Sequence, residues 1–61
     1  MNIQKIFTKN QLLEIEKIIK KNETHCTNKI LLAYFEKQNI KIPENILPSY
    51  LGYYLQYIFN K

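Results

Sequence analysis

The most reactive side chains in the sequence belong to His25 and Cys26, which are adjacent. A histidine activates a cysteine thiol when it accepts the thiol proton and a third group orients the imidazole. Adjacent residues near a helix start seldom point at each other, and the sequence offers no obvious orienting group. We therefore expect no catalysis from this pair. His25 is interpreted as a solvent-facing turn residue and Cys26 as a small core or capping residue.

Other catalytic and cofactor-binding patterns are also missing. Glu14 and Glu16 are two positions apart, so on a helix their carboxylates diverge. A single glycine is too few for a phosphate-binding loop. A structural zinc site usually needs four ligands, and His25 and Cys26 are the only good candidates. The sequence thus predicts a protein that is not an enzyme and has no metal, no cofactor and no small-molecule substrate.

Aromatic residues are concentrated near the C-terminal end of the sequence. Tyr50, Tyr53 and Tyr57 follow one another at helical spacing, and Gly52 lies among them, where it would let another helix approach closely. Tyrosine is enriched in the cores and hot spots of protein interfaces, so these four residues are predicted to form a protein interface. Two other interpretations stay open: the rings belong to the core or its rim, or they stack on nucleic-acid bases.

The charge of the chain is basic, with nine lysines against five glutamates and a net charge of +4. Lysines attract phosphate backbones as point charges. Arginine, the usual bidentate reader of guanine, is absent. A lysine-rich helix side is more often simply solvated, although an isolated Leu13 lies within this one. The candidate nucleic-acid contacts, ranked below the tyrosines, are Lys17, Lys20, Lys21, Asn28 and Lys29.

A first helix is predicted over residues 9–21. Thr8 and Gln11 have the spacing of a capping box, in which each side chain accepts a hydrogen bond from the other's backbone N–H. We expect Asn22 to end this helix in a left-handed conformation. The apolar side recurs at helical spacing as Leu12, Ile15, Ile18 and Ile19.

A second helix is predicted over residues 27–38. Either Thr24 or Thr27 can cap its start, and Asn39 is expected to end it. The short turn before it predicts an antiparallel hairpin with the first helix. The residues expected to be buried are Ile30, Leu31, Tyr34 and Phe35.

A third, aromatic helix is predicted over residues 48–60. Residues 40–43 form an extended connector because Pro43 restricts the residue before it, and Pro48 suits a first helical turn. Apolar and aromatic residues cover about two thirds of the helix circumference, whereas a surface helix needs an arc only a little over ~100°. The predicted apolar stripe is Leu47, Leu51, Tyr54, Leu55, Ile58 and Phe59.

The predicted fold class is therefore all-α, a small three-helix domain spanning residues 1–61. A chain of this size buries only about 60% of its unfolded surface, so its core is marginal. With Cys26 as the only cysteine, a disulfide within the chain is impossible, and association is the remaining source of stability. A single cysteine and a start without an apolar signal segment lead us to expect a reducing, cytoplasmic location. The apolar stretch at 50–59 is too short to span a membrane.

Two functions fit these patterns. The favoured one is a small interaction protein that self-associates or docks on a protein partner, as an inhibitor, adaptor or regulator. The alternative is a basic DNA-binding regulator, with residues 8–21 and 27–38 as a helix-turn-helix, or with residues 2–7 as the strand of a ribbon-helix-helix. The abundance of lysine, asparagine and isoleucine is typical of AT-rich genes, such as those of phages and mobile elements.

Overall fold

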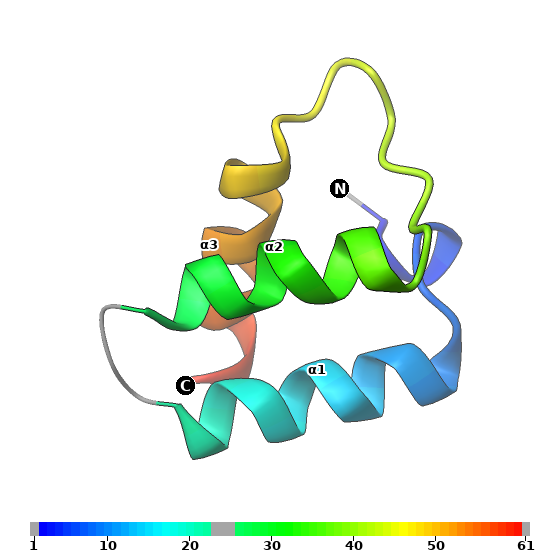
Figure 1. Ribbon diagram of the computed structural model, residues 1–61. Coiled ribbons are helices and arrows are strands. Elements are labelled where there is room, and N and C mark those ends of the chain that lie inside the picture. The colour runs from blue at the N-terminus through cyan, green and yellow to red at the C-terminus, as the bar shows by residue number, and fades with distance from the viewer. Residues whose placement is uncertain (1, 23–25, 61) are drawn as a thin grey trace.

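The computed structural model describes residues 2–22 and 26–60, and the prediction of an all-α, three-helix protein is confirmed. The helices α1 and α2 run antiparallel, so the predicted hairpin is present, and α3 passes behind α2 and ends near α1 (Figure 1). All three helices contact one another. The elements are the 3-10 helix η1 (Ile3–Lys5), α1 (Lys9–Lys21), α2 (Thr27–Lys37) and α3 (Pro48–Phe59).

The predicted capping box starts α1. The Thr8 hydroxyl accepts a hydrogen bond from the Gln11 N–H at 3.1 Å, and the Gln11 side chain accepts one from the Thr8 N–H at 2.9 Å. At the other end the prediction of a left-handed Asn22 is wrong, because its φ is −119°. Instead, the Asn22 backbone N–H and side-chain amide both donate to the Ile18 carbonyl, at 3.0 and 2.9 Å. Both donors bond to this one carbonyl, and the backbone does not reverse.

The left-handed helix end occurs on α2, at Asn39, which has φ of 53°. The Asn39 N–H donates to the Glu36 carbonyl at 3.1 Å, and the Ile40 N–H donates to the Phe35 carbonyl at 3.0 Å. This pair of hydrogen bonds is a Schellman motif. The motif turns the chain back, so that Ile40 packs against the core.

The starts of α2 and α3 lack side-chain caps. Cys26 precedes α2 and makes no side-chain capping hydrogen bond, while Thr27 is already helical; Thr24 and His25 lie outside the described residues. Cys26 is exposed, so it is not a core residue. Pro48 begins α3, as predicted. Leu47 precedes that helix in an extended conformation and is 71% exposed, so its assignment to the buried stripe is wrong.

The core lies where the three helices meet. The Phe7 and Phe35 rings contact each other at a centroid distance of 5.4 Å. Ile30, which we expected to be buried, is exposed because α2 presents the Leu31–Phe35 row to the core and Ile30 falls beside that row. Residues 3–5 form η1, so the alternative of a strand over residues 2–7 is also wrong. The buried apolar residues are Phe7, Ile15, Ile19, Leu31, Phe35, Leu51 and Leu55.

A polar contact joins α2 to α3. The buried Asn28 side chain lies against Gly52, where an added Cβ would overlap the Asn28 Oδ1 and lie 2.9 Å from its Cγ. The same Oδ1 accepts a hydrogen bond from Gln56 at 3.2 Å, and the Asn28 Nδ2 donates to the Ser49 carbonyl at 3.4 Å. The close approach that we expected at Gly52 therefore takes place within the chain.

We predict that Gly52→Ala destabilises the protein although alanine favours a helix by ~1 kcal/mol. The new methyl group displaces Asn28 and breaks its hydrogen bonds, and overpacking of this kind costs about 1–3 kcal/mol. The lost hydrogen bonds add to this cost, so the melting temperature should fall by a few degrees, as measured by circular dichroism. In the double variant with Asn28→Ala, the loss should be smaller than the sum of the two single losses. Additive losses would show that Gly52 and Asn28 do not constrain each other.

Candidate functional site

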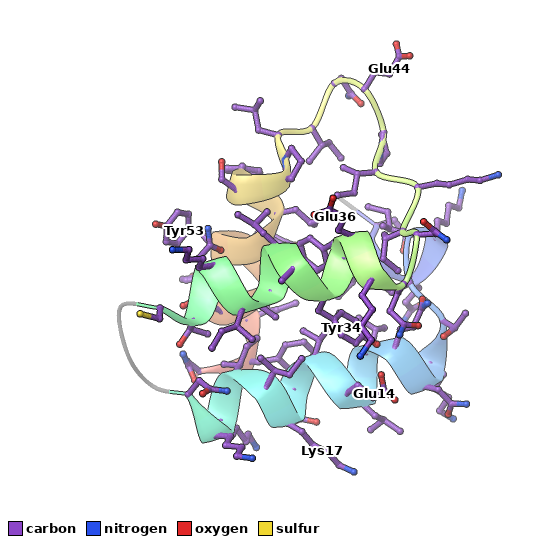
Figure 2. The ribbon with its side chains drawn as sticks, viewed as in Figure 1. Glu14, Lys17, Tyr34, Glu36, Glu44 and Tyr53 are labelled. Carbon is purple, nitrogen blue, oxygen red and sulfur yellow. The ribbon has the colours of Figure 1, made fainter. Side chains whose placement is uncertain are left out.

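Four tyrosines form one outward side of α3, here called the tyrosine face: Tyr50, Tyr53, Tyr54 and Tyr57. Three of them are mostly exposed, Tyr50 at 56%, Tyr53 at 63% and Tyr57 at 64%, while Tyr54 is half-buried. Tyr53 projects outward from the three-helix body (Figure 2). Their spacing of i, i+3, i+4 and i+7 confines them to an arc of about 100°. The core of this protein leaves most of that arc uncovered, and Tyr54 is its half-buried edge.

The tyrosine face is exposed because α3 packs through its other side. Leu51 and Leu55 point into the core and are completely buried, and Gly52 lies against α2. The structure thus brings Tyr50, Tyr53 and Tyr57 together on the surface but places Gly52 in the interior. Gly52 acts on the tyrosine face only indirectly, by letting α3 sit close to the hairpin.

The chemistry of the tyrosine face is aromatic and uncharged. α3 contains no Lys, Arg, Asp or Glu anywhere in its sequence. The Tyr50 and Tyr54 rings stack at a centroid distance of 6.5 Å and an interplanar angle of 26°. Phenol rings bury a large area with few rotatable bonds and can still hydrogen-bond through their hydroxyls. Such a surface offers ring area and hydroxyl hydrogen bonds but no charged group.

The predicted nucleic-acid contacts do not lie together. Lys17, Lys20 and Lys21 line a shallow depression on α1 with Glu16 and the 52% exposed Leu13, and Lys17 points into solvent (Figure 2). Lys20 and Glu16 form an ion pair at 3.3 Å. Lys29 is exposed on α2, whereas Asn28 is buried in the α2–α3 contact. The three α1 lysines form a basic surface, here called the lysine face.

A contact between Tyr34 and Glu14 was not predicted. The Tyr34 hydroxyl donates to the Glu14 carboxylate at 2.5 Å and links α2 to α1 near the lysine face (Figure 2). Partial burial raises the pKa of Tyr34 to about 12, and the hydrogen bond and negative charge of Glu14 add to the rise. An antiparallel hairpin brings residues far apart in sequence together, but the pairing of 14 with 34 depends on a register that the sequence pattern leaves open.

Within residues 2–22 and 26–60, no three His, Cys, Asp or Glu side chains are grouped to hold a metal ion. Over the same residues, none of the helices has the length and apolarity needed to cross a membrane. Comparison with known proteins found no matching family model, no matching curated protein and no matching solved structure. The tyrosine face and the lysine face are therefore interpreted from their own geometry.

We predict that Tyr34 ionises late in an alkaline titration followed by phenolate absorbance. The neutral phenol is favoured in the fold, so the stabilisation is complete below pH 10, the ordinary pKa, and is lost as the pH rises through about 12. Tyr34→Phe should remove the late-ionising component. Glu14→Gln should move that component to lower pH, because the amide accepts a hydrogen bond without a negative charge. A late-ionising component that stays at the same pH in Glu14→Gln would contradict the Tyr34–Glu14 contact.

Proposed function

We propose that this protein is a non-catalytic interaction protein that self-associates through the tyrosine face. One observation carries the proposal: three tyrosines, each more than half exposed, lie side by side on a helix without charge. A soluble monomer tolerates scattered exposed apolar residues, but a contiguous aromatic patch is typical of a binding surface. Association also adds stability to a chain whose own core is small.

The size of the tyrosine face fits a weak dimer. At 150–250 Å² per aromatic side chain, the exposed parts of the three tyrosines amount to about 300–450 Å². The protein has a total accessible surface of 4771 Å², so this patch is close to the tenth that a small protein commits to an interface. Two copies would bury about 600–900 Å², which lies in the range of transient complexes. We therefore expect a weak, reversible dimer.

The charge distribution supports association at this surface. Each copy carries a net charge of +4, so two copies repel each other at low ionic strength. The tyrosine face lies on the helix that contributes none of this charge. Contact through α3 therefore brings rings together and leaves the α1 lysines outside the contact.

The alternative function, DNA binding, retains support from the lysine face alone. Lys17 and Lys21 are exposed, and the two glutamates of α1 are engaged, Glu16 with Lys20 and Glu14 with Tyr34. This leaves the lysine face basic. Against the alternative, Asn28 would have to leave the α2–α3 contact to reach a base.

We predict that Tyr53→Ala weakens self-association without unfolding the protein. Tyr53 is 63% exposed, so its loss removes interface area and leaves the core intact. Sedimentation equilibrium should give a dissociation constant at least about tenfold higher, as for a hot-spot tyrosine. Tyr34→Phe is the matched control, because it alters a tyrosine outside the tyrosine face. A wild-type protein that stays monomeric at millimolar concentration, or a helicity loss in the variant, would contradict the proposal.

The DNA-binding alternative predicts binding that weakens steeply as salt increases. Each neutralised phosphate contributes about 0.9 to the slope of log affinity against log salt. Replacing Lys17, Lys20 and Lys21 by glutamine should therefore lower that slope by about 2–3 in a mobility-shift titration. Self-association of the same variant should be unchanged, which separates the two functions. No binding of DNA at low salt removes the alternative.

A further inference from the structure

We infer that α1 binds the surface of an anionic lipid bilayer, with the lysine face on the headgroups and Leu13 inserted between them. This contact uses a different helix from the proposed self-association and does not depend on it. Two features carry it: lysines surround an exposed leucine, and that leucine also lines an apolar groove. Together they match a surface that is negatively charged outside and apolar just beneath.

Leu13 lies at the centre of the outward side of α1. It is exposed, whereas the isoleucines on the core side of the helix are buried. Lys9 precedes it by four residues and Lys17 follows it by four, so each is one turn away and about 40° around the helix. Lys20, seven residues after Leu13, lies about 20° around the helix from it. Exposed lysines therefore lie before and after Leu13 on the same side of α1.

The apolar surface extends beyond the Leu13 side chain. A groove of about 270 Å³ lies between α1, η1 and the end of α3, and Lys9 also lines it. The apolar residues that line the groove are Ile3, Leu12, Leu13, Ile58 and Phe59. All of these except Leu13 are half-buried, so each still offers part of its surface. Leu13 thus belongs to a contiguous apolar patch with Lys9 and the lysine face beside it.

The charge of this surface is mainly positive. Glu16, which also lies on it, forms an ion pair with Lys20 at 3.3 Å. Lys9, Lys17 and Lys21 pair with no acidic side chain within residues 2–22 and 26–60. Each lysine held near an anionic bilayer strengthens binding about fivefold and needs no fixed geometry to do so.

A bilayer fits this surface better than a nucleic acid or an acidic protein does. A phosphate backbone attracts the lysines but offers Leu13 no apolar layer. Protein interfaces favour arginine over lysine, and this chain has nine lysines and no arginine. Lysine suits a bilayer, because its aliphatic stem lies along apolar surface while its ammonium group stays among the headgroups.

Co-sedimentation with lipid vesicles tests the contact. Wild-type protein should bind vesicles of equal parts phosphatidylserine and phosphatidylcholine, and should bind vesicles of phosphatidylcholine alone much more weakly. Leu13→Asn should lower the partition coefficient about three- to tenfold, because a half-exposed leucine no longer enters the hydrocarbon. Leu47→Asn is the matched control and should leave the partition coefficient unchanged, since Leu47 is also exposed but lies outside this surface.

Paired lysine variants test whether the charge acts at this surface. Replacing Lys17 and Lys21 by glutamine should weaken vesicle binding by about tenfold or more. Replacing Lys29 and Lys41, which are exposed on α2 and in the connector, gives the same net charge and should weaken binding less. Equal losses in the two pairs would show adsorption by net charge alone and would overturn the contact through α1.

A fluorescent reporter shows which side of the protein enters the bilayer. The chain has no tryptophan, so Leu13→Trp gives a single signal, which should shift to shorter wavelength on anionic vesicles. Tyr53→Trp, on the tyrosine face, should not shift. Circular dichroism checks the helicity of each variant, and Leu13→Ser replaces Leu13→Asn if that variant unfolds. A shift at position 53 in place of position 13, or binding to duplex DNA or polyglutamate without binding to anionic vesicles, would overturn the bilayer contact.

Discussion

The packing of Gly52 on Asn28 is the constraint on which the rest of this structure depends. It brings α3 close to the start of α2, and the hydrogen bonds of Asn28 to Ser49 and Gln56 fix the rotation of α3 about its own axis. Once that rotation is set, Leu51 and Leu55 must point into the core. On the other side of the helix, Tyr50, Tyr53 and Tyr57 then point toward solvent. A rotation of 100° would exchange core and surface residues on this helix.

As a consequence, α3 has one side buried in the core and one side exposed to solvent. One side completes a small core shared with the hairpin, and the other presents stacked and exposed phenol rings. A marginal core cannot also cover the second side, because two short helices offer too little apolar surface. The proposed self-association would cover it with an identical helix. Stability and binding would then be coupled through concentration, as in other small proteins that fold alone only weakly.

The lysine face and the tyrosine face belong to different helices and differ in character. On α1, the glutamates are held by Lys20 and Tyr34, and the remaining lysines extend into solvent. On α3, there is no charge. A dimer formed through α3 would therefore keep both lysine faces outside the contact. Any attraction of phosphate groups would act at those faces, independently of the dimer contact.

The sequence by itself determined the elements, because their signals are local: the Thr8–Gln11 capping box, the proline at the start of α3 and the helical spacing of apolar residues. The same spacing placed the tyrosines on one side of α3. Tertiary structure decided what local patterns cannot encode. It set the register that pairs Glu14 with Tyr34, left Ile30 and Leu47 exposed, and buried Asn28 against Gly52. The physical reason is that each of these outcomes depends on the distance and rotation between helices, which are fixed only when side chains from different elements pack together.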